Sequence, residues 1–130
     1  MATYTRLWLL VLFSQLLTGC IHPMSKKTEY CVVMTTCPTQ LEADTHARAI
    51  IEKGLGACVQ TSQIQSHYQW EGKVQTENEI LMRIKTTCAK YSDVEAYLVA
   101  EHSYEVPQII QLPITAGLSE YLDWVKKETK

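Results

Sequence analysis

A regular two-residue alternation of side chains, within and just before the run from Ser66 to Thr86, is the feature that most constrains the fold of this chain. In its first arm, every second position falls on one face, at Ile64, Ser66, Tyr68 and Trp70. The intervening positions hold three glutamines and His67. A period of two is typical of a half-buried β-strand, so this arm is predicted to be one.

The second arm alternates in the same way and follows a short turn. Glu71-Gly72 predicts the turn, because glycine reaches a positive φ without steric cost. Ile80, Met82 and Ile84 then share one face, with polar or mixed residues between them. The two arms predict a long β-hairpin, which the other elements are expected to cover.

The elements on either side predict an α+β domain. A continuous apolar run over 30–36 is typical of a buried strand. A predicted capping box, Thr39 to Glu42, then opens a helix that ends at Gly54. A second box, Ser92 to Glu95, predicts another helix. A strand over 106–113 and a short amphipathic helix over 118–127 complete the chain. The resulting order, βαββαβ with a C-terminal helix, is the split βαβ pattern of a ferredoxin-like domain.

Composition bounds the class of protein. With 130 residues, 46% hydrophobic and 20% charged, the chain is predicted to form one globular domain. A net charge of −2 gives no basic surface, so nucleic acid is not expected as a partner. The five cysteines are odd in number and form no CxxC pair, which favours free structural thiols over a disulfide framework.

Residues 1–20 have the features of a leader, with 21–29 as a linker and 30–130 as the domain. Arg6 precedes an apolar run from Leu7 to Leu17, too short to cross a bilayer of about 30 Å. The run ends in Leu-Thr-Gly-Cys20, which resembles a bacterial lipobox and predicts a lipoprotein-type signal peptide, lipidation at Cys20 and a place in the cell envelope. The alternative is a non-translated leader and a cytoplasmic protein that starts at Met24, which would suit its thiols better.

Five motifs fall in an order and spacing that resemble one family over residues 30–127. They are Gly54-Leu-Gly-Ala-Cys58-Val, Tyr68-Gln-Trp70-Glu-Gly72-Lys73, Ile84-Lys85-Thr86-Thr87, His102-Ser-Tyr104-Glu105-Val106-Pro107 and Tyr121-Leu-Asp-Trp124. Together they resemble the CutA divalent-cation tolerance family. The resemblance implies a ferredoxin-like fold, a homotrimer similar to the PII signalling proteins, and association with copper or another divalent cation. A closed trimer would also pair the strand edges of the long hairpin.

The resemblance implies metal ligands at the end of the first strand and just before the Tyr-Glu-Val-Pro motif. This sequence departs from the family there: Thr35 stands at the position of a cysteine, and Glu101 at that of a histidine. Only His102 matches a ligand position of the family directly, and Cys37 and Glu101 are further candidate metal ligands. Thiolate and imidazole suit copper, and imidazole also suits zinc. The alternative is an inert buried Cys37 and a hydrogen-bonded loop histidine.

The remaining histidines and cysteines are not expected to bind metal. His46, on the first helix, and His67, on the polar face of the hairpin, are predicted to be surface residues without a ligand partner. Cys31, Cys58 and Cys88 lie in or beside apolar runs and are predicted to be buried structural thiols.

A second set of residues is expected to line an intersubunit cleft. It combines aromatic, acidic and basic side chains, at Tyr68, Trp70, Lys73, Glu79, Lys85, Tyr104 and Glu105. Such a cleft could bind a small ligand or carry acid–base chemistry. The alternative is that these residues lock the trimer through stacking and ion pairs. The sequence contains no recognisable catalytic motif, so a binding protein is expected rather than an enzyme.

Overall fold

The computed structural model describes residues 28–130 of the chain. The predicted leader, its lipidation site Cys20 and most of the linker lie outside the described residues and stay predictions. Within residues 28–130, no helix is long and apolar enough to cross a membrane.

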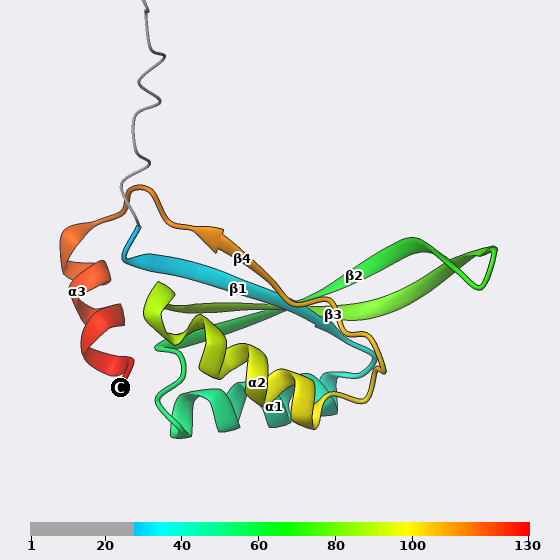
Figure 1. Cartoon of the computed structure of the whole chain (residues 1–130), viewed down its shortest axis with the longest axis horizontal. Coiled ribbons are helices and arrows are strands. Elements are labelled where there is room, and N and C mark those ends of the chain that lie inside the picture. The colour runs from blue at the N-terminus through cyan, green and yellow to red at the C-terminus, as the bar shows by residue number, and fades with distance from the viewer. Residues whose placement is uncertain (1–27) are drawn as a thin grey trace, which may run out of the picture.

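The order of elements is that of a split βαβ domain followed by a C-terminal helix (Figure 1). In chain order they are β1 (Tyr30–Cys37), α1 (Gln40–Glu52), β2 (Cys58–Trp70), β3 (Lys73–Thr87), the 3-10 turn η1 (Cys88–Lys90), α2 (Tyr91–Glu101), β4 (Ile110–Pro113) and α3 (Ser119–Glu128). The strands form one sheet in the order β2-β3-β1-β4, and every neighbouring pair is antiparallel. This confirms the ferredoxin-like prediction, with β1 central between β3 and β4.

The predicted hairpin is the longest feature of the sheet. β2 and β3 pair from Cys58 opposite Lys85 to Trp70 opposite Lys73, whereas β1 covers β3 only as far as Ile80. The outer half of the hairpin therefore projects beyond the sheet as a two-stranded arm (Figure 1). Glu71 and Gly72 have φ values of 48° and 76°, which is the geometry of a type I′ turn that follows the twist of the strands.

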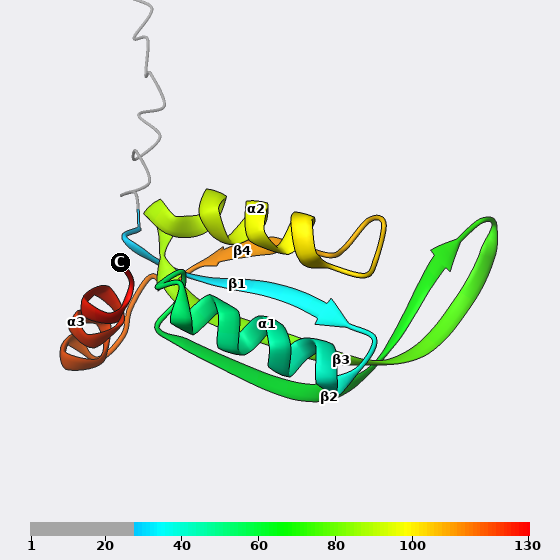
Figure 2. The same cartoon turned by 90° about the horizontal axis from the view of Figure 1, so that it is seen from below.

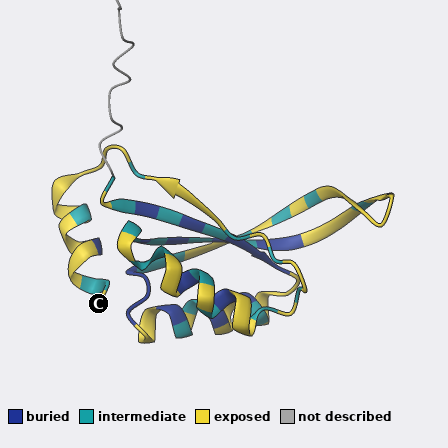
Figure 3. Cartoon of the chain, viewed as in Figure 1, coloured by how far each residue is buried: buried dark blue, intermediate teal, exposed yellow. Residues whose placement is uncertain are grey.

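Both long helices, α1 and α2, cover the same face of the sheet, as the view in Figure 2 shows. The core lies between them and the sheet, where the alternation predicted for β3 is confirmed: Ile80, Met82 and Ile84 are buried. Apolar side chains of β1 and of the two helices complete it, at Cys31, Val33, Cys37, Ala43, Ile50, Val94 and Leu98. The hairpin arm, by contrast, is largely exposed in a single chain (Figure 3).

Several local predictions are wrong in detail. The Thr39 hydroxyl accepts the N–H of Glu42, as a capping box requires, but the Glu42 carboxylate bonds to Ser103 instead of turning back. The second box is absent from the described helix start, because α2 begins at Tyr91 and its N-cap Lys90 makes no side-chain cap bond. The last strand is also shorter than the predicted 106–113, since only 110–113 pair with β1.

Gly56 lies where the chain passes close to the core, and this position generates a stability prediction. A Cβ there would sit 2.7 Å from Cγ2 of Ile84 and 3.1 Å from Cγ2 of Ile50. Overpacking of this kind typically costs about 1–3 kcal/mol. Gly56→Ala is therefore expected to lower the free energy of unfolding in urea by that amount, whereas the exposed control Lys53→Ala should change it by less than about 0.5 kcal/mol. An unchanged midpoint in Gly56→Ala would contradict this packing.

Candidate functional site: a sulfur, carboxylate and imidazole cluster

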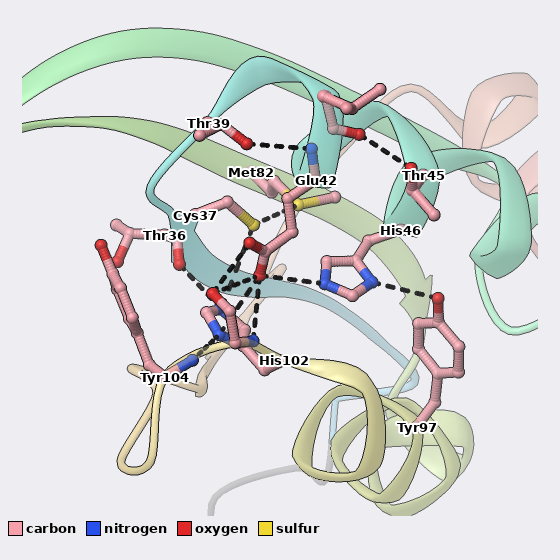
Figure 4. Close-up of polar contacts among 12 residues, drawn as sticks. Thr36, Cys37, Thr39, Glu42, Thr45, His46, Met82, Tyr97, His102 and Tyr104 are labelled. Atoms are coloured by element: carbon pink, nitrogen blue, oxygen red, sulfur yellow. Dashed lines mark hydrogen bonds and ion pairs between the residues drawn. The ribbon is translucent and has the colours of Figure 1, made fainter.

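Three segments far apart in the sequence meet at the C-terminal end of β1 (Figure 4). They are the end of β1 at Cys37, the first turns of α1, and the loop that leaves α2 at His102. The antiparallel placement of β1 beside β4 brings them together, as the topology predicted. Titratable side chains from all three segments face one another here.

Glu42 connects α1 to the loop after α2. Its carboxylate accepts the Ser103 N–H at 3.1 Å and the Ser103 hydroxyl at 2.8 and 3.0 Å, and it lies 3.6 Å from Nδ1 of His102. Burial alone would raise the pKa of Glu42, but the Ser103 hydrogen bonds and the neighbouring His102 and His46 outweigh it. The net effect lowers the pKa of Glu42 below its usual value, which keeps an anion at the centre of the site.

Cys37 supplies a fully buried thiol to the same place. Its Sγ lies 3.5 Å from Sδ of Met82 and 4.0 Å from Nε2 of His102. Burial, with smaller contributions from the charges of Glu42 and Glu79, raises the pKa of the Cys37 thiol to about 12. The thiol is therefore protonated at neutral pH, and an ion that binds it must displace the proton.

His46 is buried, with only 3% of its surface exposed, so the prediction that it is a surface residue is wrong. Its Nδ1 is 3.1 Å from the hydroxyl of Tyr97, which fixes the ring orientation. Its Nε2 is buried and has no hydrogen-bond partner in residues 28–130. The Glu42 carboxylate is near it, at 3.5 Å, on the side of the ring that faces Cys37.

Cys37, Glu42 and His46 form the one group of potential metal ligands within residues 28–130, with donor atoms all within 4.8 Å of one another. Thiol, carboxylate and imidazole at such distances can converge on a single ion after small side-chain rotations. The unpartnered Nε2 of His46 fits this use, because a buried polar atom without a partner is otherwise costly.

His102, the ligand implied by the family resemblance, uses both ring nitrogens in hydrogen bonds. Nε2 lies 2.9 Å from the carbonyl oxygen of Thr36, which can only accept, and Nδ1 receives the N–H of Tyr104 at 3.0 Å. These two hydrogen bonds tie the loop after α2 to β1. A role as a ligand, which stays a prediction, would require one of these bonds to break.

The other residues singled out by the resemblance lie at the margin of the cluster. Thr35 is in β1 on the same face as Cys37, fully buried, and its Oγ1 has no hydrogen-bond partner in the described part of the chain. Glu101 is the exposed last residue of α2, and its charge helps to raise the pKa of Tyr97, after burial as the main cause. Its proposed role as a ligand stays a prediction.

The aromatic and acidic candidates gather in a separate cleft between the hairpin arm and the loop after α2. The cleft has a volume of about 840 Å³, and Tyr68, Trp70, Tyr104 and Glu105 line it together with Glu79. These residues come together within one chain. Lys85 is not among the residues that line this cleft in the single chain: it lies opposite Cys58 near the other end of β3, where its ammonium donates to Gln60.

Glu42 and His46 are site residues that the local sequence patterns do not indicate. The capping pattern places Glu42 only at a helix start, and His46 has no partner at ligand spacing among the predicted ligands. The available signal was their spacing of four, which places both on one face of a helix that starts directly after Cys37. The four cysteines in residues 28–130 are free thiols, as predicted, but Cys58 and Cys88 are only partly buried, so the prediction that they are buried is wrong.

Comparison with known proteins agrees with this architecture. The family model of the CutA1 divalent ion tolerance protein matches residues 31–128. The divalent-cation tolerance protein CutA of Archaeoglobus fulgidus is 40% identical over 93 residues, which cover 72% of this chain and 91% of the relative. Protein CutA of Homo sapiens is 41% identical over 96 residues, which cover 73% of this chain and 54% of the relative. The chain also spans only 59% of the chloroplastic CutA of Arabidopsis thaliana.

Solved structures give the same result. A structure described as the periplasmic divalent cation tolerance protein CutA from Archaeoglobus fulgidus superimposes with a TM-score of 0.77 at 37% identity, covering 78% of this chain and 99% of that one. The structure of CutA1 from Oryza sativa superimposes with a TM-score of 0.77 at 39% sequence identity, covering 79% of this chain and 95% of that one. The molecule is thus a ferredoxin-like α+β domain with a sulfur, carboxylate and imidazole cluster at one end of its sheet. It belongs to the CutA1 divalent ion tolerance family.

The low pKa of Glu42 generates a prediction on the pH dependence of stability. A carboxyl group whose pKa is lower in the folded than in the unfolded protein stabilises the fold above its unfolded value, here about 4.5, and this contribution is lost as pH falls through the folded value. Glu42→Gln should cost about 1–2 kcal/mol of unfolding free energy at pH 7, and the difference from the parent should shrink by pH 3. Measurements with a chelator present, beside the exposed control Glu52→Gln, test this. A difference that is constant with pH would contradict it.

Proposed function

We propose that this protein is a trimeric divalent-cation tolerance protein that binds copper through Cys37, Glu42 and His46. Its place in the CutA1 family supports the role in tolerance, and relatives in Archaeoglobus fulgidus and Thermus thermophilus carry that description in their names. Those names describe a tolerance function and no reaction, so we assign a binding role rather than an enzymatic one. The observation that supports the metal site is that the donor atoms of three side chains, two of them buried, lie within 4.8 Å of one another.

The chemistry of the donor set favours copper over the other metal ions, and Cu(I) over Cu(II). Thiolate and thioether sulfurs select Cu(I), whereas imidazole and carboxylate also accept Cu(II) and Zn(II). The thioether of Met82 is 3.5 Å from the Cys37 sulfur, so a second soft ligand stands beside the first. Zinc gains little from a thioether, because its usual ligands are thiolate, imidazole and carboxylate.

The neighbours of these residues would position them rather than bind the ion. Tyr97 holds Nδ1 of His46, and the same hydrogen bond leaves Nε2 directed at the site. His102 stacks on His46, with ring centroids 5.7 Å apart, and anchors the loop whose Ser103 orients Glu42. Outer-shell contacts of this kind fix the geometry and the tautomer of ligands.

Native mass spectrometry of the chain, titrated anaerobically with Cu(I) and separately with Zn(II), tests the metal site. We expect one high-affinity Cu(I) per chain, and a loss of affinity of more than about tenfold in Cys37→Ser and in His46→Gln. Binding releases the Cys37 proton, so the affinity should be higher at pH 8 than at pH 6. The volume-conserving change Met82→Leu should weaken Cu(I) binding while leaving Zn(II) binding nearly unchanged.

Two variants serve as matched controls in that titration. Cys58→Ser removes a thiol, and His67→Gln removes the exposed imidazole that bonds to Thr76, both far from the cluster in sequence and on β2. Neither should alter the stoichiometry or affinity. Equal losses in the control and test variants, or no uptake by the folded parent, would contradict the proposed site.

The trimer is supported by what a single chain leaves exposed. β2 and β4 are the two edges of the sheet, and within residues 28–130 the arm of the hairpin has no third strand beside it. Ile110 and Leu112 on β4 and Trp70 on the arm are also exposed. Unpaired edges with apolar side chains favour association, and a closed cyclic assembly removes them.

Native mass spectrometry without added metal should give a mass three times that of the chain. Leu112→Lys on β4 places a charge in the expected interface and should shift the population to monomer. Leu41→Lys, at an exposed position on α1 rather than on an edge strand, is the matched control and should leave the trimer intact. A monomeric parent would contradict the assembly.

A further inference from the structure

Two cysteines become neighbours where β1 begins and β3 ends. Cys31 lies opposite Thr86 in the β1–β3 ladder, and both side chains are fully buried. The ladder continues past Thr87, because the N–H of Cys88 donates to the carbonyl oxygen of Glu29 at 2.8 Å. Cys88 is thus two positions beyond Thr86 and is the diagonal neighbour of Cys31 on the same face of the sheet.

The surroundings of Cys31 agree with this register. Cys31 belongs to the apolar core, and Cys88 packs against the same core. Burial, with smaller contributions from the adjoining Cys88 thiol, raises the pKa of the Cys31 thiol to about 12. The pKa of Tyr91, the first residue of α2, is raised by its hydrogen bond to Glu95, by burial and, less strongly, by Cys31. Cys31 therefore faces Cys88 and the start of α2.

The two thiols differ in their access to solvent. Cys31 is fully buried, whereas Cys88 is only partly buried and has the Thr28 hydroxyl 3.9 Å from its Sγ. A small oxidant in solution would therefore reach Cys88 first. Cys88 begins η1, which belongs neither to the hairpin arm nor to the edge strands β2 and β4 that the proposed trimer would pair.

A disulfide between these thiols requires a small approach of the two segments. Diagonal neighbours in an antiparallel pair have Cα atoms about 7–8 Å apart, and a disulfide needs them within about 6.8 Å. The shift of roughly 1 Å would fall at the ends of elements, because Cys88 is the first residue of η1 and Cys31 is the second of β1. A strained disulfide is reduced more easily than a relaxed one, which suits a reversible bond.

We propose that Cys88 and Cys31 form a reversible disulfide within one chain when the protein meets hydrogen peroxide, with Cys88 oxidised first. The bond would tie the start of α2 to the start of β1. It uses none of the side chains assigned to the metal cluster, so it stands or falls separately from copper binding.

The reaction has two steps. The Cys88 thiolate attacks one oxygen of the peroxide, so that an S–O bond forms, the O–O bond breaks, and the released hydroxide takes up a proton and leaves as water. The Cys31 sulfur then attacks the sulfur of this sulfenic acid, so that the S–S bond forms, the S–O bond breaks, and the hydroxide leaves as a second water with the Cys31 proton. The two sulfurs lose two electrons, which the peroxide gains. A dithiol reductant reverses the bond by thiol–disulfide exchange.

Peptide mapping by mass spectrometry tests the proposal on the full chain, treated with hydrogen peroxide in the presence of a chelator, then alkylated and digested with trypsin without reductant. We expect Cys88 and Cys31 in one linked pair of peptides, lighter by two hydrogen atoms than the two free thiol peptides together. The linked pair should disappear after treatment with dithiothreitol. Fragmentation assigns the bond to Cys31 or to Cys37, because trypsin leaves both on the peptide 28–48.

Single substitutions establish the order of the steps. Cys31→Ser removes the thiol that resolves the sulfenic acid, so labelling of Cys88 by dimedone should rise by about fivefold or more. Cys88→Ser should leave Cys31 reduced at the same dose of peroxide. The matched control Cys58→Ser removes the other partly buried thiol of residues 28–130 and should form the bond as the parent does.

Three outcomes would overturn the proposal. The first is sulfenic or sulfinic acid at Cys88 in the parent while Cys31 stays a free thiol. The second is a bond from Cys88 to Cys37 or to another copy of the chain. The third is oxidation of Cys31 in Cys88→Ser as fast as in the parent, which would show that Cys88 is not oxidised first. Thermal unfolding of each variant separates these results from a loss of fold.

Discussion

The hydrogen bonds of the Glu42 carboxylate hold the functional end of this molecule together. Through Ser103 they tie α1 to the loop after α2, and the same carboxylate lies beside His46 and His102. The contact joins residues that are 61 positions apart in the sequence. Without it, α1 and this loop would be linked mainly by packing, and neither Cys37 nor His46 would face a fixed anion. The geometry of the cluster therefore depends on this one side chain.

The same loop connects two chemically different places. On one side of it, Ser103 orients the anion of the metal cluster, and His102 bonds to the backbone of Thr36. On the other side, Tyr104 reaches Glu79 in the acidic cleft. Each of these three loop residues has a partner outside the loop, which fixes it.

Periodicity predicted the fold because the strands obey simple rules. The hairpin, its Glu71-Gly72 turn and the buried face of β3 follow from alternation and from one glycine, and the split βαβ order follows from the sequence of elements. The metal cluster was harder to predict, because it arises from tertiary contacts. Glu42 satisfies a local capping pattern, yet its carboxylate finds a stronger partner in Ser103, so the distant contact prevailed over the local one.

The histidines show the same limit. The family resemblance implies His102 as a metal ligand. The histidine whose ring nitrogen has no hydrogen-bond partner in residues 28–130 is instead His46, four residues after Glu42 on α1. His46 lies three residues after Ala43 and four before Ile50, so it shares the buried stripe of α1, but a polar ring on such a stripe does not by itself indicate a ligand. Burial, the Tyr97 hydrogen bond and the proximity of Cys37 become visible only once the helix is docked on the sheet.

Anomalous diffraction at the copper edge, from crystals of the protein loaded with copper, tests the metal site most directly. This account predicts one peak per chain within bonding distance of Cys37 Sγ and His46 Nε2, with a Glu42 oxygen or Met82 Sδ completing the ligands. His102 should keep its bonds to Thr36 and Tyr104. A peak coordinated by His102 instead, with His46 left unbound, or a peak only on the surface, would contradict the assignment.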